Sequence, residues 1–224
     1  MANNKVKIKK AKASDMLFLA VLAYLCLMVE PILRYLIMWT PLIDNVPIGN
    51  MWWTLILRVL CCAVWGLTVF CIVKVSRGCG FDPLKSTGKL TPLQWGITAV
   101  ISIVFAAVMI VLDGGFGGLV EFNSPVYTIS RFIFEGFQVA VMVLVMSLGQ
   151  KWGDLLVKKN NKFIPFGGIV LGVCMMLVNI ITGGFSLTAL FILGIQLIYG
   201  MIFVFAGKNA LVAAPFIYLM FVTM

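Results

Sequence analysis

The sequence predicts an all-α protein, a polytopic bundle of about seven transmembrane helices with a cytoplasmic N-terminus. Hydrophobic residues make up 62% of the 224 residues and charged residues 11%, and the mean hydropathy is +1.09. A soluble globular chain is about half apolar and about a quarter charged. Apolar stretches long enough to cross a hydrocarbon core about 30 Å thick also recur along the chain. These observations exclude an ordinary soluble domain, a disordered chain and a nucleic-acid-binding module.

Seven segments have the length and apolar character of a membrane span, which needs about 20 mostly apolar residues. The first contains Glu30-Pro31, and the proline predicts a kink there because it cannot donate a helical hydrogen bond. The last is short, so we expect it to be tilted or only partly inserted. The segments are Met16–Trp39, Met51–Val75, Leu93–Leu112, Tyr127–Leu148, Phe163–Thr182, Ser186–Ala206 and Ala210–Met224.

The basic residues outside these segments predict the orientation. They precede the first segment and follow the second, fourth and sixth, which places all of them on one side. The opposite loops carry Asp44, Asp113 and Glu121 but no lysine or arginine. By the positive-inside rule the basic side is cytoplasmic. The net charge of +9 then indicates topology and contact with membrane lipids rather than nucleic acid. We expect a basic cytoplasmic tail, residues 1–15, and one integral membrane domain, residues 16–224.

The chain lacks some residue types that enzymes commonly use, and this limits the reactions that it could catalyse. The chain has no histidine, which excludes Ser–His and Cys–His nucleophiles, histidine-ligated zinc and histidine proton relays. The six cysteines show no paired spacing in a polar outer segment, so no disulfide framework is predicted. We interpret Cys61, Cys62 and Cys71 as small apolar fillers rather than soft metal ligands. No metal and no cofactor are expected.

Five ionisable residues fall inside the predicted spans, where each is costly and marks a candidate functional site. Glu30 and Arg34 are spaced i,i+4 on the first span, and Arg131 and Glu135 have the same spacing on the fourth. Each pair can neutralise itself, so a purely structural interpretation stays open. Arg58 has no partner within its own span and is expected to reach Glu30, Glu135 or a carbonyl group on a neighbouring helix.

The fourth span carries a continuous polar stripe. Thr128, Arg131, Glu135 and Gln138 follow one another at helical spacing. Lipid would not tolerate such a stripe, so we expect it to face the bundle interior or a water-filled cavity.

The next two spans offer polar partners for this stripe. Gly168-x-x-x-Gly172 is a close-packing motif, and Asn179 shares its face on the fifth span. Gln196 lies on the sixth span with Tyr199 adjacent. We predict a buried cluster in which Asn179 and Gln196 join the carboxylate and amide of the fourth span, with the arginine near its outer end.

Several short stretches follow one another in a familiar order. They read Phe134-Glu-Gly-Phe-Gln-Val-Ala140, Gly149-Gln-Lys-Trp-Gly153, Met175-Met-Leu-Val-Asn179, and Gly207-Lys-Asn209 leading to Tyr218. In order, spacing and hydropathy the region 78–224 resembles the CAAX protease and bacteriocin-processing (CPBP or Abi) family of intramembrane proteases. The resemblance covers roughly the last two-thirds of the chain.

The resemblance places Glu135 and Asn179 at two of the family's catalytic positions. Gly136 stands where the family has its second glutamate, and Ala140 replaces its arginine. Water activation needs one group to accept a proton and others to orient the reactants. One carboxylate and one amide without an imidazole make a poor site of this kind, and they bind a divalent metal weakly. The resemblance therefore implies a member that has lost proteolysis. The expected binding-cavity residues are Arg131, Gln138, Gln196, Tyr199 and Tyr218.

Three functional hypotheses remain open. The first is a non-catalytic protein of the bacterial plasma membrane that binds a membrane protein or peptide, for example in bacteriocin self-immunity or scaffolding. The second is a residual intramembrane peptidase that uses Glu135. The third is a small-solute transporter or its substrate-binding subunit, although Ala20-x-x-Ala23 lacks the Ala-x-x-x-Ala spacing of energy-coupling-factor subunits. No ring of carboxylates or filter-like loop indicates a channel.

Overall fold

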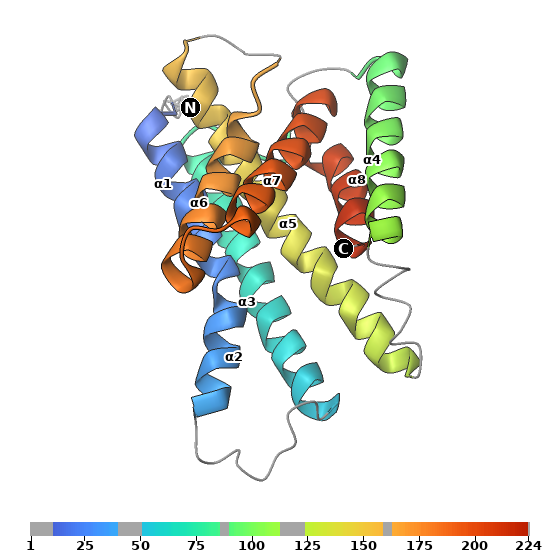
Figure 1. The fold of residues 1–224 in the computed structure, drawn as a ribbon. Helices are drawn as coiled ribbons and strands as arrows, with labels where there is room; N and C mark the ends of the chain where they lie inside the picture. Colours follow the sequence, from blue (N-terminus) through green and yellow to red (C-terminus); the bar gives the residue numbers. More distant parts are fainter. Residues whose placement is uncertain (1–10, 40–50, 86–89, 113–123, 159–162, 224) are drawn as a thin grey trace, which may run out of the picture.

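The computed structural model describes residues 11–39, 51–85, 90–112, 124–158 and 163–223. Within these ranges all regular structure is helical, and eight helices follow one another along the chain (Figure 1). Asp44, Asp113 and Glu121 lie outside the described residues. The helices are α1 (Ala13–Leu27), α2 (Val29–Trp39), α3 (Met51–Gly78), α4 (Pro92–Leu112), α5 (Pro125–Leu156), α6 (Phe166–Gly183), α7 (Leu187–Phe205) and α8 (Ala210–Val222).

Six helical segments in the described part of the chain are long and apolar enough to cross a membrane, with α1 and α2 together forming one of them. The protein is therefore an all-helical integral membrane protein. The seventh predicted segment forms α8, which has only 13 residues. At 1.5 Å per residue it extends about 20 Å, which is less than a hydrocarbon core of about 30 Å. Six long segments and the shorter α8 are close to the predicted count of about seven, and the last segment is short as predicted.

The kink predicted in the first span is confirmed. The helix ends at Leu27 and a new helix begins at Val29. Pro31 has no N–H to donate to the carbonyl of Leu27, and the next hydrogen bond runs from the N–H of Ile32 to the carbonyl of Met28 at 3.1 Å. At the other end α1 already begins at Ala13, so the last three residues of the predicted tail belong to the helix.

The predicted fourth span ends at Leu148, but α5 continues to Leu156. Two glycines lie on the face of α5 that contacts α6. A Cβ at Gly149 would lie 3.2 Å from the Cα of Gly167, and one at Gly153 would collide with the ring of Phe166. These glycines allow close helix contact inside the membrane protein and do not end the helix.

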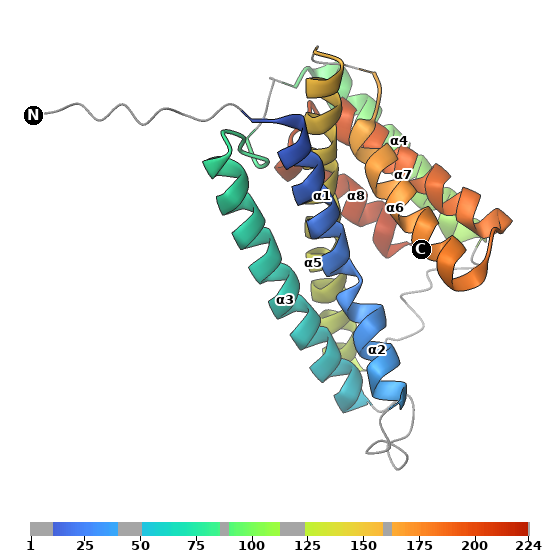
Figure 2. The ribbon, with the colours of Figure 1, turned by 90° about the vertical axis from the view of Figure 1, so that its left-hand side faces the viewer.

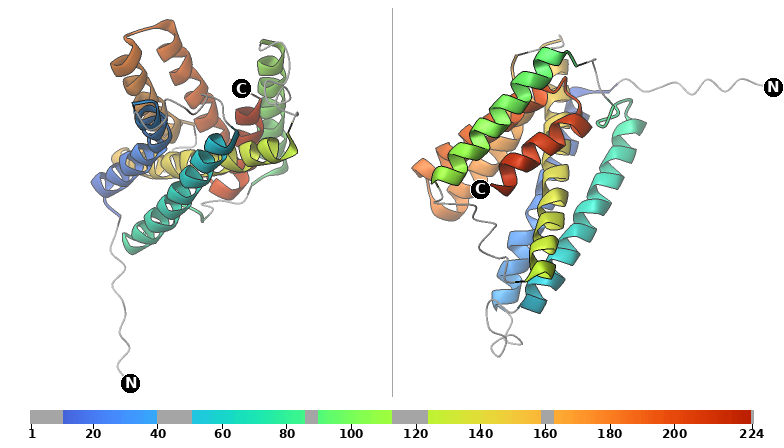
Figure 3. Two further views of the ribbon diagram at one scale, coloured as in Figure 1. Left: turned by 90° about the horizontal axis from the view of Figure 1, so that it is seen from below. Right: turned by 90° about the vertical axis from the view of Figure 1, so that its right-hand side faces the viewer.

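The long helix α5 lies at the centre of the bundle and packs against α1, α3, α6 and α8 (Figures 2 and 3). On one side Trp65 of α3 donates its indole N–H to the carbonyl of Cys26 in α1 at 2.9 Å. Its ring also packs against Phe134 of α5, with 4.9 Å between the ring centroids. On the other side α6 and α7 form an antiparallel hairpin, and α4 packs against α7 and α8. Two groups of helices thus meet at α5.

The helix directions agree with the sorting of the basic residues. The starts of α1, α4 and α6 and the ends of α3 and α5 lie together at the upper end of the molecule (Figures 1 and 2). The described lysines at this end include Lys12, Lys74 and Lys151. That this end faces the cytoplasm stays a prediction.

Candidate functional site

The two intramembrane ion pairs form as their spacing predicts. The guanidinium Nε of Arg34 lies 2.6 Å from Oε1 of Glu30 on α2. The Nε of Arg131 lies 2.6 Å from Oε1 of Glu135 on α5. The pairs differ in burial, because the Arg34 side chain is 49% exposed and that of Arg131 only 21%. In both, the charges of one helix balance each other.

Arg58 reaches a carbonyl group on a neighbouring helix, one of the three predicted partners. Its Nη1 donates to the carbonyl of Tyr127 at 3.0 Å and to the hydroxyl of Ser130 at 2.9 Å, both on α5. The guanidinium also lies over the Tyr127 ring, 4.0 Å from its centroid. This buried arginine therefore joins α3 to α5 at the end of the bundle opposite Lys151.

Glu135 lies on α5 near the contact of this helix with α8. The ring of Tyr218 on α8 lies beside Gly136, where an added Cβ would be 3.9 Å from its Cε2 atom. The Tyr218 hydroxyl donates to the carbonyl of Phe132 on α5 at 3.0 Å. Glu135 is paired with Arg131 through Oε1, whereas its Oε2 is buried and accepts no hydrogen bond from the described residues. Tyr218 closes the α5–α8 contact beside Gly136.

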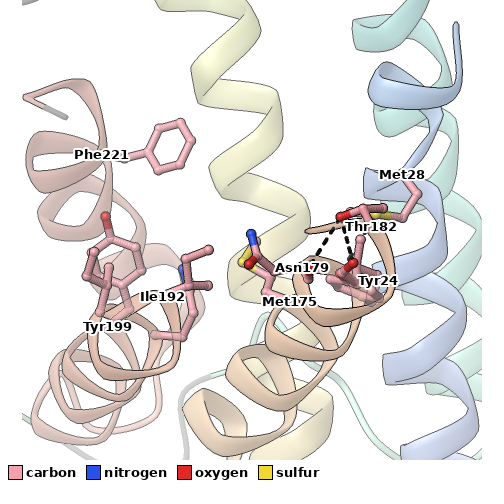
Figure 4. Close-up of a pocket in the computed structure, with 11 residues that line it drawn as sticks. Tyr24, Met28, Met175, Asn179, Thr182, Ile192, Tyr199 and Phe221 are labelled. Carbon is pink, nitrogen blue, oxygen red and sulfur yellow. Dashed lines mark hydrogen bonds between the residues drawn. The ribbon is translucent and has the colours of Figure 1, made fainter. Parts of the chain in front are cut away.

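A cavity of about 310 Å³ opens on the other face of the bundle, between α1, α6, α7 and α8 (Figure 4). Its walls are mostly apolar, and none of the described side chains that line it carries a formal charge. The lining residues are Tyr24, Met28, Met175, Val178, Asn179, Thr182, Ile192, Ile195, Gln196, Tyr199 and Phe221.

Helical spacing and two glycines build the principal wall of this cavity. The α6 and α7 side chains each follow an i, i+3, i+4, i+7 pattern, so each set lies on one helix face. A Cβ at Gly168 would lie 2.5 Å from the carbonyl oxygen of Gln196, and one at Gly172 would lie 2.7 Å from Leu193. The predicted close-packing motif is confirmed, and it aligns the two faces side by side.

The polar groups of the cavity are amides and hydroxyls. Gln196 is only 6% exposed, and its side-chain oxygen accepts no hydrogen bond from the described residues. Asn179 lies near the middle of the cavity between α7 and α1 (Figure 4). Thr182 donates to the carbonyl of Val178 at 2.9 Å, so its hydroxyl is engaged within α6.

The structure divides the polar cluster that the sequence predicted. Three of its residues line the cavity, and they come from α6 and α7: Asn179, Gln196 and Tyr199. The remaining site residues lie on α5 and α8 and are not among the lining side chains: Glu135, Arg131, Gln138 and Tyr218. Sequence reasoning missed Tyr24 and Thr182, although the face that Thr182 shares with Asn179 follows from their spacing.

A second polar cluster, also missed, lies where α5 ends. Gln150 is 2% exposed and donates to the carbonyl of Ile164 at 3.1 Å. Asp154 accepts from the ammonium group of Lys208 at 2.6 Å. The i,i+4 spacing of Gln150 and Asp154 is a signal for this cluster, but the predicted fourth span ended at Leu148.

No group of three or more Cys, Asp or Glu side chains in the described ranges is arranged to hold a metal ion. No protein-family model matches the chain, and comparisons with curated proteins and with solved structures find no match either. The candidate site therefore has to be interpreted from its own geometry.

Proposed function

We propose that the protein is a non-catalytic membrane protein that binds a membrane peptide, or the transmembrane segment of a partner protein, in the cavity between α1, α6, α7 and α8. One observation carries the proposal. The cavity presents two amide side chains, Asn179 and Gln196, within a mostly apolar lining in which none of the described residues is charged.

The absence of charge in the cavity favours binding over hydrolysis. A hydrolytic site needs a group that accepts the proton of water near neutral pH. Tyrosine hydroxyls, amides and a threonine do not serve as such a base. Glu135, the carboxylate that the family resemblance assigns to catalysis, is engaged by Arg131 and is not one of the lining residues.

The chemistry of the cavity favours a peptide. A carboxamide carries both a donor and an acceptor, as a peptide group does, so Asn179 and Gln196 can pair with a backbone whose hydrogen bonds are incomplete. A volume of about 310 Å³ is at the lower end of ligand pockets, which are about 300–1,000 Å³. It suits one or two apolar side chains of a helix that approaches from the lipid.

The resemblance to the CPBP family gives this proposal a concrete form. Within that family the expected role is bacteriocin self-immunity or scaffolding in the bacterial plasma membrane, with the basic end of the bundle in the cytoplasm. The uncharged cavity is compatible with a member that retains the scaffold without the reaction.

The test uses the full chain in lipid nanodiscs and a dansyl-labelled Leu/Ala transmembrane peptide with one central asparagine. We expect saturable energy transfer from the protein's tryptophans to the dansyl group. Gln196→Leu should weaken this binding about tenfold, since a buried amide hydrogen bond is lost. Gln138→Leu is the matched control because Gln138 lies in the same bundle but does not line the cavity.

A second measurement separates the peptidase hypothesis. The same peptide is incubated with the parent protein and with Glu135→Gln, and products are sought by mass spectrometry. We expect an intact peptide with both proteins. Cleavage by the parent that Glu135→Gln abolishes would replace the binding proposal with the residual peptidase. Equal binding by Gln196→Leu and the parent would refute the assignment of the cavity.

A further inference from the structure

Two hydroxyl groups that line the peptide-binding cavity already donate their hydrogens within the protein. The hydroxyl of Tyr24 donates to the sulfur of Met28 at 3.7 Å. The hydroxyl of Thr182 donates to the carbonyl of Val178 at 2.9 Å. Figure 4 shows Tyr24, Met28 and Thr182 together on one side of the cavity. A hydroxyl oxygen that has donated its hydrogen still has lone pairs, so both groups offer a ligand acceptors rather than donors.

The amide of Asn179 adds a further acceptor. Its side chain makes no hydrogen bond with the described residues, and it lies near the middle of the cavity (Figure 4). Asn179 is partly exposed, whereas Gln196 is only 6% exposed. Asn179 is therefore the more accessible of the two amides, and a carboxamide without a fixed partner can turn its oxygen toward a ligand.

The apolar part of the cavity suits an aromatic side chain. Aromatic rings line it from three helices: Tyr24 of α1, Tyr199 of α7 and Phe221 of α8. The thioethers of Met28 and Met175 also line it, and both rings and thioethers make favourable contacts with another ring. A cavity of about 150 Å³ already holds a benzene molecule, so a volume of about 310 Å³ leaves room for a side chain of two fused rings.

We propose that the cavity binds a tryptophan side chain of the partner transmembrane segment, which donates its indole N–H to the carboxamide oxygen of Asn179. The inference rests on the proposed function and names the residue that anchors the partner. Tryptophan combines a large apolar ring system with one donor and no acceptor, which complements apolar walls that carry acceptor oxygens. It is also among the residues that most often anchor protein interfaces.

Other side chains complement the cavity less well. Serine and threonine in a helix donate to the carbonyl four residues earlier and bring no spare donor, as Thr68, Thr98 and Ser102 show at 2.8–2.9 Å. Lysine or arginine would bring a charge that none of the described lining residues balances. Phenylalanine has no donor, and tyrosine and asparagine each add an acceptor to their donor.

The bundle already contains a contact of the proposed kind. Trp65 of α3 is fully buried and donates its indole N–H across to the carbonyl of Cys26 in α1 at 2.9 Å. Its ring packs against Phe134 of α5, with 4.9 Å between the ring centroids. One tryptophan thus joins three helices by combining apolar packing with a single donated hydrogen bond. The partner's tryptophan would join its own helix to the cavity by the same combination.

The test uses Leu/Ala transmembrane peptides whose central residue is tryptophan, 5-methyltryptophan, 1-methyltryptophan or phenylalanine, each given its own mass by isotope-labelled leucine. The full chain in lipid nanodiscs is incubated with an equimolar mixture, and native mass spectrometry compares the bound peptides. We expect the two peptides that keep the indole N–H to bind about fivefold more than the other two. Asn179→Leu should remove this preference, and the control Gln138→Leu should retain it, because Gln138 does not line the cavity.

Other outcomes overturn the inference in distinguishable ways. Equal binding of the tryptophan and 1-methyltryptophan peptides to the parent would exclude the donated hydrogen bond, and this comparison does not depend on how any variant folds. A preference that survives Asn179→Leu would refute the assignment of the acceptor. If the asparagine peptide of the earlier test binds but tryptophan has no advantage over phenylalanine, only the anchor residue is wrong. If none of the peptides binds, the proposed function fails as well.

Discussion

The charged residues around α5 and the amides on the α6–α7 hairpin represent two ways of placing polar groups in a membrane. Beside α5 the charges meet partners at close range: Glu135 with Arg131 at 2.6 Å, and Arg58 with a carbonyl of α5 at 3.0 Å. On the hairpin the side-chain oxygen of Gln196 is buried and accepts no hydrogen bond from the described residues. The second carboxylate oxygen of Glu135, Oε2, is likewise buried and accepts no hydrogen bond from the described residues, so the two places differ in that Glu135 is paired with an arginine whereas Gln196 lines an open cavity.

The comparison distinguishes polar groups that stabilise the fold from polar groups that are available to a ligand. A charge inside a membrane must be compensated for the helix to insert, so a satisfied pair is explained by folding alone. A buried amide with spare hydrogen-bonding capacity lowers stability without an evident structural return. The Gln196 amide lines an open cavity that a ligand can enter, whereas the Glu135 carboxylate does not, which is why the cavity rather than the α5 ion pair is the candidate site.

The largest expected effect follows the removal of one partner of the Arg131–Glu135 ion pair on α5. Arg131→Met leaves the carboxylate of Glu135 buried without its guanidinium, which should destabilise the protein by about 3–5 kcal/mol. The double variant Arg131→Met/Glu135→Leu should recover most of that loss. Unfolding in SDS from mixed micelles measures both. Equal losses in the single and double variants would mean that the pair does not act as a unit.

The next largest effect concerns the contact between α6 and α7. Gly168→Leu would place a side chain against the Gln196 carbonyl and Gly200, so overpacking should destabilise the protein by about 1–3 kcal/mol and abolish peptide binding. Gly194→Leu on α7 is the control, since a Cβ there meets nothing within 4 Å. The same unfolding and peptide-binding measurements apply, and similar losses in both variants would contradict the close-packing interpretation.

The sequence predicted much of this architecture because its signals are local. Hydropathy located the six long helical segments. Pro31 predicted the kink, and Gly168-x-x-x-Gly172 predicted a close helix contact, which α6 makes with α7. The sequence also identified the last segment as short, and α8 has only 13 residues. The predicted fourth span stopped before the last turns of α5. Gly149 and Gly153 are residues typical of loops, but in the structure they lie against α6.

The predicted site was divided for a different reason. Periodicity along one helix shows which residues share a face, so the α5 stripe and the Asn179 face were both recognisable. It does not show which neighbouring helix that face meets. The Asn179 face turns toward a cavity that α1 and α8 complete with Tyr24 and Phe221, and those contacts join residues far apart in the chain. Only the packed structure determines such a pairing.

A smaller effect of opposite sign is expected at the cavity. Gln196→Leu removes a buried oxygen without a hydrogen-bond partner in the described structure, so stability should rise by about 1 kcal/mol. The same substitution should weaken peptide binding, which sets function against stability. Gln138→Leu should change binding little. If Gln196→Leu lowers stability and leaves binding intact, the amide is structural and the contrast with α5 fails.

The smallest effect is expected at the other ion pair. Glu30 and Arg34 have the same spacing and the same 2.6 Å separation as the pair on α5, but the Arg34 side chain is 49% exposed. An exposed guanidinium can extend toward the headgroups or water when its partner is lost, so the cost of Glu30→Gln should stay below about 1 kcal/mol. SDS unfolding of Glu30→Gln beside Arg131→Met compares the two pairs directly. Because their geometry is the same, a loss at Glu30 as large as that at Arg131 would show that burial is not what distinguishes them.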